Sequence, residues 1–446
     1  MRIEKDLLGD VIIPKLLPYG SQTQRAIDLY PISSDKPLSA YPKLVSNLLK
    51  VKKAAVLTNI STGELSRDHG LALLSVIEEL LTNLPEVIES YFPVHALHGG
   101  GGISSNMNVN EVIANLANQK VFGVAFGGYA PLHPNDHVNL NHSTSDLLNT
   151  AGHLAILEGW KEFHECIDHL EGIFQNLADN FRAAKKIART CLQDAVEISF
   201  GDLFDGYNVS IKRSHGILQQ DVRSLNTINI GGNIIGRRGD CSEAFFESIV
   251  SNLKSVTDNT ELERANNLFD YSQNHDDMIR FASNLEQLAL TLIKIAKDLR
   301  LMASGPSTGL GEICLPAVQQ GSSAMPGKIN PTIPEFLIQS CIQVSGYCHS
   351  VRMTHAHGEL DYNPWQSIVI TNLLDSMSTM KNAIEVFIEH CLKGIGVNNE
   401  RNTHNLESII PTMVNIMQEK GYRFAAGLYK DCDGDLERIR EYMNNL

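Results

Sequence analysis

The sequence has little positive charge, no long apolar run and no closely spaced pair of cysteines. Its 446 residues include 37 Lys and Arg against 51 Asp and Glu, which gives a net charge of −14. Nucleic acids and anionic membranes attract proteins through basic fields, so this balance argues against both as partners. A small anionic substrate is compatible with it, because a pocket can be locally positive on an acidic protein.

Two further absences concern membranes and oxidised cysteine. No stretch of about 18 uninterrupted apolar residues occurs, so the sequence predicts no membrane-spanning helix. The first residues, MRIEKDLLGD, lack the charged-then-apolar pattern of a secretory signal. The eight cysteines are dispersed without a CxxC pair, which argues against a zinc site and against a disulfide framework. We therefore expect a cytoplasmic protein with reduced thiols, and we expect neither a metal nor a cofactor.

Apolar residues recur at helical spacing over two long segments. One has alternating steps of three and four residues, the spacing of a coiled-coil seam. Its apolar positions are Met278, Phe281, Leu285, Leu288, Leu292, Ile295, Leu299 and Met302. The other runs from Leu154 to Phe181, about seven helical turns. Helices of this length predict a bundle and favour one that is shared between subunits.

Glycine- and proline-rich segments interrupt the helical pattern. They lie at residues 98–102, 127–135, 229–239 and 305–334. Long loops between well-formed helices are common places for binding residues and lids. We expect a mixed N-terminal domain over residues 1–134, a helical central domain over 135–391 and a short C-terminal domain over 392–446.

The last of these loops has the most informative composition. Its segment GSSAMPGKINP, residues 321–331, combines glycine, two hydroxyls, a lysine and an amide. Lys328 can hold a carboxylate as a charge and Asn330 as a directed donor. A serine beside them can act as a nucleophile or as a base. From composition alone, a surface loop with ordinary turn residues is the plainer interpretation.

Three other polar segments have both a structural and a functional interpretation. HSTSD, residues 142–146, precedes a long helix and can cap it or hold an anion at its N-terminus. RTCLQD, residues 189–194, can contribute to a site or form an Arg/Asp loop pair with a buried thiol. HGGGGISSNMN, residues 98–108, can present backbone donors to an anion but lacks the GxxxxGKS pattern of a phosphate-binding loop.

Together these motifs resemble those of one enzyme superfamily. GSSAMPGKINP is similar to the signature loop GSSxMPxKxNP of the aspartase/fumarase superfamily. RIEKDLLG, SNMNVNEVIAN, HPNDHVN, RTCLQDAV and SGPSTGLGEICLP resemble other stretches of its aspartate ammonia-lyases and class II fumarases. The resemblance covers about residues 2–399, and LQDAV and the N-terminal stretch look closer to aspartase. It implies a mainly α fold in which long central helices form a tetrameric twenty-helix bundle, with smaller N- and C-terminal domains.

The resemblance also implies a reaction, which is anti elimination across a succinyl unit with release of fumarate. Ser322 would be the base, acting as an alkoxide in a loop that closes over the substrate, and Met325 would line the pocket. Lys328 and Asn330 would hold one carboxylate of this small dicarboxylate. The other carboxylate, which takes up negative charge, would be held by Ser143, Thr144 and Thr190. Each site of the expected homotetramer would be shared between three chains.

The sequence departs from the family pattern around the leaving group. Ile103 stands where members usually have Thr, Ser145 where aspartases have an Asn that contacts the amino group, and Cys191 where a polar residue is usual. Asn106, in the SNMN stretch, belongs to the same expected substrate-binding set. An unmet donor or acceptor in such a pocket costs a few kcal/mol, on the order of 10²-fold in discrimination. We therefore expect inefficient turnover of plain aspartate.

Arg237 and Arg238 stand where family members have a small Thr-Gly pair. They are either a solvated surface pair or extra anion contacts for a larger substituent. The expected activity is that of a C–N lyase acting on aspartate or on a modified aspartate or succinate. The alternatives are a fumarase-like hydratase, a lyase that expels another group from succinate, and a non-catalytic protein that retains the scaffold.

Overall fold

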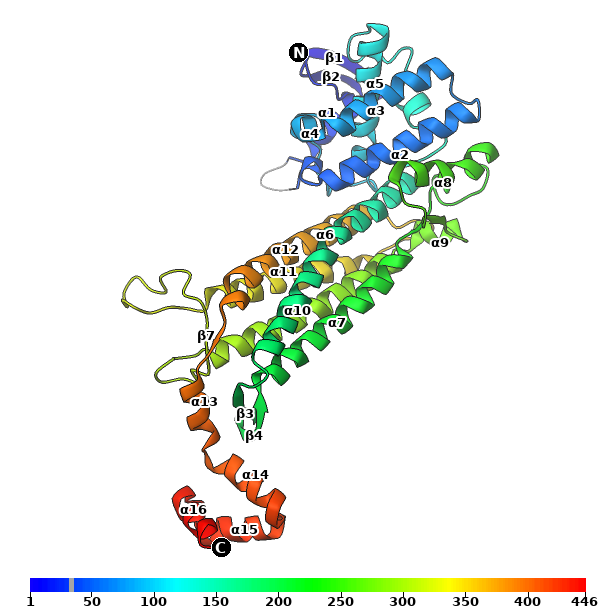
Figure 1. Ribbon diagram of the computed structural model, residues 1–446. Helices are drawn as coiled ribbons and strands as arrows, with labels where there is room; N and C mark the ends of the chain where they lie inside the picture. The colour runs from blue at the N-terminus through cyan, green and yellow to red at the C-terminus, as the bar shows by residue number, and fades with distance from the viewer. Residues whose placement is uncertain (32–35) are drawn as a thin grey trace. The chain divides into compact units, whose positions relative to one another are not determined.

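The computed structural model describes residues 1–31 and 36–446 and is mainly helical, as predicted (Figure 1). The chain divides into two compact units. Unit 1 contains residues 1–163, 217–286 and 344–378, and unit 2 contains residues 164–216, 287–343 and 379–446. The long helices that contribute one end to each unit are α6 (Thr144–Asn180), α7 (Phe200–Ser224), α10 (Asp276–Met302), α11 (Thr332–His355) and α12 (Gln366–His390). The tetrameric bundle and the three-domain division remain predictions.

Unit 1 begins with an antiparallel hairpin of β1 (Arg2–Asp6) and β2 (Gly9–Ile13). The elements that follow are α1 (Ser21–Leu29), η1 (Leu38–Ala40), α2 (Pro42–Ser61), α3 (Arg67–Thr82), α4 (Leu84–Tyr91), α5 (Ile103–Phe122) and η2 (Pro134–Val138). A second group lies between α7 and α10 in the chain. Its members are β5 (Thr227–Ile228), α8 (Glu243–Thr257), β6 (Glu263–Arg264) and α9 (Leu268–Gln273), with β5 and β6 parallel.

Helix α5 is buried around its whole circumference from Ser105 to Asn118. Two of its buried asparagines, Asn115 and Asn118, bond to backbone groups of the loop that follows the helix. Asn115 accepts from the Gly127 N–H at 2.7 Å, and Asn118 both donates to the Leu132 carbonyl at 2.7 Å and accepts from the Leu132 N–H at 3.0 Å. These bonds fix the loop that leads to HPNDHVN.

Unit 2 contains an antiparallel hairpin of β3 (Lys185–Thr190) and β4 (Gln193–Ser199), and a short pair of β7 (Ile313–Cys314) with β8 (Gly396–Val397). The remaining elements are η3 (Leu392–Gly394), α13 (Asn399–Leu406), α14 (Ile409–Lys420), α15 (Tyr422–Asp431) and α16 (Leu436–Asn444). The last three helices share a small apolar core, made of Ile416, Ala425, Leu428, Cys432 and Ile439. Helix α13 packs on β3 and α14 packs on β4.

The apolar seam predicted from the sequence lies on α10. All eight of its positions are buried, from Met278 to Met302. In unit 1, α6 and α12 also approach closely, because a Cβ atom on Gly152 would overlap the side chain of Ile370. Burial of this continuous stripe stabilises the long helix against its neighbours.

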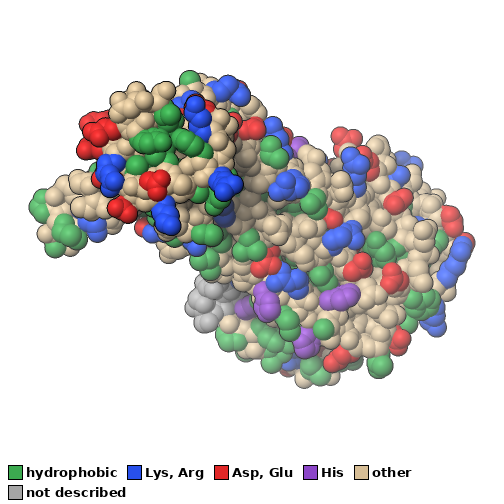
Figure 2. All heavy atoms as spheres, turned by 90° about the horizontal axis from the view of Figure 1, so that it is seen from below, with side chains coloured by type: hydrophobic (Ala, Val, Ile, Leu, Met, Phe, Trp, Pro, Cys, Tyr) green, Lys and Arg blue, Asp and Glu red, His purple; other side chains and the backbone are tan. Residues whose placement is uncertain are grey.

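The surface mixes charges of both signs. On the face drawn in Figure 2, Lys and Arg side chains are interspersed with Asp and Glu. Among the described residues, no helix combines the length and the apolar content that crossing a bilayer requires.

Candidate active site

The signature loop, residues 321–331, is closed on itself within unit 2. The Gly321 N–H donates to the Lys328 carbonyl at 2.9 Å, and the Asn330 amide donates to the Gly321 carbonyl at 2.8 Å. A Cβ atom at position 321 would lie 2.6 Å from the Lys328 carbonyl oxygen, so only glycine permits this closure. The loop therefore has a defined shape without help from other segments.

Ser322 is half-buried at the start of a turn within this loop. Its Oγ accepts the backbone N–H groups of Ala324 and Met325, each at 3.1 Å. Two oriented N–H dipoles stabilise negative charge on the oxygen that accepts them. The turn thus provides what an alkoxide at Ser322 would need.

A cleft of about 900 Å³ lies beside the loop within unit 2. Lys328 and Asn330 line it, together with Lys297 and Arg300 near the end of α10. Arg300 is paired with Glu335 at 2.9 Å. Asp298 lines the cleft as well, so the three cations and two carboxylates of the lining leave a net charge of +1, which gives this part of an acidic chain a modest preference for anions.

Ser143 and Thr144 lie in unit 1 at the N-terminus of α6, where both are half-buried. The Asp146 carboxylate closes the first turn, because its Oδ1 accepts the Ser143 N–H at 2.9 Å. Its Oδ2 accepts the N–H groups of Gly231 and Asn233 at 3.0 and 2.9 Å. Burial raises the pKa of Asp146 to about 7, although these three N–H groups and Lys52 act in the opposite direction. Asp146 therefore holds the helix start and leaves both hydroxyls for another partner.

A chain of buried hydrogen bonds, here called the donor chain, connects Lys52 through Asn139 and Asn106 to the start of α6. Lys52 donates to Asn139 Oδ1 at 2.8 Å and lies 2.7 Å from His142 Nε2. His142 Nδ1 lies 2.8 Å from the Leu140 carbonyl oxygen, which can only accept a hydrogen bond, so the ring proton is on Nδ1. Nε2 is then free of a proton and accepts from Lys52. Burial lowers the pKa of Lys52 well below its usual value, and burial together with Lys52 does the same to the pKa of His142.

The donor chain reaches a predicted site residue through Asn106. The Asn106 amide donates to Asn139 Oδ1 at 3.1 Å and to Thr144 Oγ1 at 2.8 Å. The structure thus brings Asn106 and Thr144 into direct contact. Because Thr144 Oγ1 accepts here, its own hydroxyl proton points elsewhere and can be donated to an anion.

The positions expected around the leaving group lie in different surroundings. Ser145 is buried next to Tyr362, whose hydroxyl donates to the Gly101 carbonyl at 3.2 Å. Ile103 begins α5 directly after the glycine run and is exposed. A Cβ atom on Gly101 would lie 2.8 Å from the Tyr362 hydroxyl oxygen, so the glycine makes room for this side chain.

Thr190 and Cys191 lie on the β3–β4 hairpin of unit 2. Thr190 pairs with Gln193, so Cys191 and Leu192 form the two-residue turn between the strands. Their φ angles are 53° and 62°, the left-handed pair of a type I′ turn, for which Asn-Gly is preferred. Cys191 is exposed, so the alternative interpretation as a buried thiol is wrong.

A buried carboxylate fixes this hairpin. Glu312 is fully buried and forms ion pairs with Arg189 and, at 3.3 Å, with Lys186. Its backbone carbonyl accepts from the Asn398 N–H at 3.0 Å and from the Asn402 amide at 2.9 Å. Arg189 in RTCLQDAV and Glu312 in SGPSTGLGEICLP therefore position Thr190.

Comparison with known proteins gives the family. A family profile described as "Lyase" matches residues 18–346. An aspartate ammonia-lyase from a Bacillus species is 37% identical over 441 residues, covering 99% of this chain and 92% of the relative. A class II fumarate hydratase from Thermosynechococcus vestitus is 32% identical over 442 residues, covering 99% and 93%. The chain belongs to the aspartase/fumarase superfamily.

Solved structures agree with this family membership. The fumarate lyase:delta crystallin from Brucella melitensis, solved bound to cobalt, superposes with a TM-score of 0.94 at 36% identity, covering 99% of this chain and 95% of that one. A class II fumarase from Schistosoma mansoni gives a TM-score of 0.92 at 27% identity, covering 100% and 96%. The predicted enzyme class is thus confirmed: the protein is an aspartase/fumarase-type lyase.

The two arginines that depart from the family pattern are exposed and locally paired. Arg237 forms an ion pair with Asp240, and Arg238 with Glu243 while lying over the ring of Phe246. This geometry is that of a surface pair on the loop before α8. Their possible role as additional anion contacts remains a prediction.

Sequence reasoning missed Lys52, Asn139 and Tyr362 as neighbours of the site. Lys52 lies on α2 beside Lys53 and two residues after Lys50, and nothing in the sequence distinguishes the buried lysine from these two partly exposed ones. Tyr362 lies in the connection between α11 and α12, outside every recognised stretch.

The predicted site residues are divided between the two units. Ser143 and Thr144 belong to unit 1, whereas Thr190, Ser322, Lys328 and Asn330 belong to unit 2.

Proposed function

We propose that this lyase catalyses anti β-elimination from aspartate, or from a modified aspartate or succinate, and releases fumarate. The single observation that carries the proposal is the turn in which Ser322 Oγ accepts two backbone N–H groups inside a self-closed loop. This arrangement lowers the cost of an alkoxide, and an alkoxide can remove a weakly acidic C–H proton. The aspartate ammonia-lyases among the relatives favour a C–N bond as the one that breaks.

In the proposed mechanism, Ser322 takes the proton from the carbon next to one carboxylate. The electron pair of the C–H bond moves into that carboxylate, which becomes a doubly charged aci-carboxylate. This species then expels the leaving group from the neighbouring carbon, and the C=C bond of fumarate forms. For aspartate the leaving group is the amine, which departs as ammonia.

Stabilising the extra negative charge is the main electrostatic task of such a site. Ser143 and Thr144 at the N-terminus of α6, with Thr190 of β3, would hold the carboxylate that takes up this charge. The helix N-terminus contributes partial positive charge there, and the Lys52–Asn139–Asn106 chain orients the Thr144 hydroxyl.

The other carboxylate would bind at the signature loop. Lys328 and Asn330 line the cleft beside Ser322, and Met325 in the same loop is exposed toward solvent. One Asn330 N–H bond is used to close the loop, and the second N–H of that amide can reach a ligand. We further propose that sites are completed by three chains of a homotetramer.

The activity is tested with purified protein, aspartate, malate and a panel of substituted succinates, by following the ultraviolet absorbance of fumarate. Absence of fumarate from every substrate would contradict the proposal. Relative rates with fumarate plus ammonia and with fumarate in water distinguish the lyase from a fumarase-like hydratase, which is the second candidate because class II fumarate hydratases are also relatives.

The base is tested by Ser322→Ala, which should lower kcat by about 10²- to 10⁴-fold, the usual contribution of a general base. Ser323→Ala is the matched control, because the neighbouring serine is exposed and has no assigned role. Oligomeric state and circular dichroism should be unchanged in both variants. An unchanged kcat in Ser322→Ala would refute its role as the base.

A further inference from the structure

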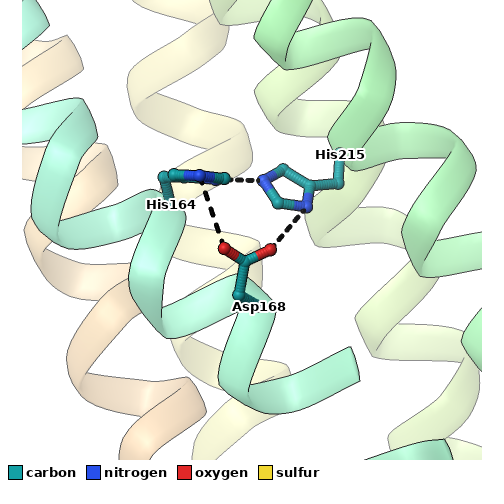
Figure 3. A group of neighbouring side chains, drawn as sticks. All are labelled: His164, Asp168 and His215. Atoms are coloured by element: carbon teal, nitrogen blue, oxygen red, sulfur yellow. Dashed lines mark hydrogen bonds and ion pairs between the residues drawn. The ribbon is translucent and has the colours of Figure 1, made fainter. Parts of the chain in front are cut away.

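His164, Asp168 and His215 lie together between α6 and α7 within unit 2 (Figure 3), and Glu171 of α6 contacts His215 as well. His164, Asp168 and Glu171 follow one another on α6 at spacings of four and three residues, which places them on one face of the helix. His215 faces them from α7. Figure 3 shows the Asp168 carboxylate with one oxygen directed toward each imidazole ring.

The distances in this cluster suit a shared cation. His164 Nε2 lies 3.4 Å from Asp168 Oδ2, and His215 Nδ1 lies 3.7 Å from Asp168 Oδ1. One ligand atom from each of the three residues lies within 4.8 Å of the other two. A tetrahedral ion with bonds of about 2.0–2.2 Å separates neighbouring ligand atoms by about 3.3–3.6 Å. Small side-chain rotations are therefore enough to bring the three residues onto one ion.

Glu171 offers a fourth ligand or a supporting contact. Its Oε1 lies 2.7 Å from His215 Nδ1, and the two side chains are only 15% and 4% exposed. Such a carboxylate supports a histidine that binds a metal through its other ring nitrogen, here Nε2, whereas Glu171 becomes the fourth ligand if the ion binds at Nδ1. Because Asp168 is 54% exposed, an ion can enter the cluster from the solvent side.

The two rings also contact each other directly. His164 Nδ1 lies 2.7 Å from His215 Nε2, and two imidazole nitrogens at this distance share one proton. The cluster thus holds two imidazoles and two carboxylates around shared protons, and a divalent cation can replace a proton as their common partner.

We propose that His164, Asp168 and His215, supported by Glu171, bind one divalent transition-metal ion of the zinc type, which joins α6 to α7. Two imidazole ligands favour such an ion over Mg²⁺ or Ca²⁺, which prefer oxygen ligands. None of these residues belongs to the proposed elimination site. We expected no metal because the cysteines are dispersed, and the two histidines form no short motif, since they lie 51 residues apart on different helices.

The test uses full-length, tag-free protein that has been treated with chelator and then titrated with Zn²⁺ by calorimetry. One Zn²⁺ should bind per chain, and bound Zn²⁺ should raise the unfolding temperature. His164→Ala and His215→Ala should each weaken Zn²⁺ binding by at least about tenfold. The matched control is His169→Ala, an exposed histidine on the same helix outside the cluster, which should bind Zn²⁺ as the wild type does.

A spectroscopic measurement keeps the proposal falsifiable if a variant folds poorly. With Cu²⁺ as the probe, electron paramagnetic resonance should show nitrogen couplings from two imidazoles in the wild type and from one in His164→Ala. Circular dichroism confirms the fold of each variant. Absence of stoichiometric Zn²⁺ binding, wild-type Zn²⁺ affinity in both histidine variants, or nitrogen couplings that persist unchanged without His164 would overturn the assignment.

Discussion

Ser145 and Cys191 occupy two positions at which the sequence resemblance implies larger polar side chains in aspartases. The Ser145 hydroxyl is buried beside Tyr362, and Cys191 is an exposed turn residue. The double variant Ser145→Asn with Cys191→His should raise kcat/KM for aspartate by about tenfold or more, because added donors can pair with the leaving amino group. Steady-state kinetics with aspartate measures this effect.

The control for this exchange is Cys191→Ser, which adds a hydroxyl too short to replace an imidazole. It should leave kcat/KM for aspartate close to the wild-type value. If the double variant shows no gain over this control, the two departures do not explain substrate choice.

Asp146 gives a pH dependence of stability whose sign follows from its burial. Burial raises the folded-state pKa of this carboxyl to about 7, above the ordinary value of 3.8. The folded chain therefore holds this proton more tightly than the unfolded chain, and the associated stability is present below about pH 4 and lost as the pH rises through about 7. The loss has a limiting slope of about 1.4 kcal/mol per pH unit.

Asp146→Asn removes this titration. Between pH 4 and pH 7, the unfolding free energy of the wild type should therefore fall relative to that of the variant, as measured by urea unfolding at several pH values. Parallel pH profiles of the two proteins would contradict the assignment.

At the element scale, the β3–β4 turn places two side chains in left-handed backbone conformation. Leu192 has φ 62° and is 73% exposed, so its side chain contributes little burial to offset the strain. Leu192→Gly should stabilise the protein by about 1 kcal/mol, since a left-handed non-glycine residue costs about 1–2 kcal/mol. Thermal unfolding measures the gain.

Leu192→Ala is the matched control for the turn, because it shortens the side chain but keeps the Cβ atom that causes the strain. It should unfold close to the wild-type temperature. A glycine variant no more stable than the alanine variant would show that the turn is not strained.

Helices were more predictable from this sequence than the hairpin. The alternating three- and four-residue spacing predicted the helix over 278–302, and α10 begins at Asp276. The apolar stripe from Leu154 located α6, and HSTSD indicated its start, which lies at Thr144 beside the Ser143–Asp146 capping bond. RTCLQD gave no hairpin signal, because Cys-Leu is an unfavourable sequence for a type I′ turn and tertiary ion pairs to Glu312 hold it.

The candidate site was predictable only in part, for a related reason. The signature loop is a local motif, so its resemblance to the family loop assigned Ser322, Lys328 and Asn330, although composition alone favoured an ordinary surface loop. Lys52 and Tyr362 reach the site through tertiary packing, and no local pattern marks them. The site roles rest on the family resemblance together with this geometry.

At the scale of the whole molecule, the proposed sharing of sites between chains predicts complementation. Ser322→Ala and Thr144→Val should each be inactive alone, because one lacks the base and the other a carboxylate contact. If different chains supply these residues, mixed tetramers formed by unfolding and refolding an equal mixture should regain activity in about a quarter of their sites. Fumarate formation by the refolded mixture measures the recovery.

The control is a refolded sample of each variant alone, which should remain inactive. Light scattering should give the mass of four chains for every sample. A mixture as inactive as its components would show that one chain supplies both residues.

The self-closed signature loop separates two tasks that evolution can then alter independently. The bonds that shape the surroundings of Ser322 all come from the backbone and side chains of residues 321–330. In the proposed site, substitutions at Ile103, Ser145 or Cys191 would therefore change which group departs without altering the loop proposed to remove the proton. The same loop would then serve lyases that eliminate ammonia and lyases that eliminate water. New substrate specificities would arise by exchange of a few residues on other segments.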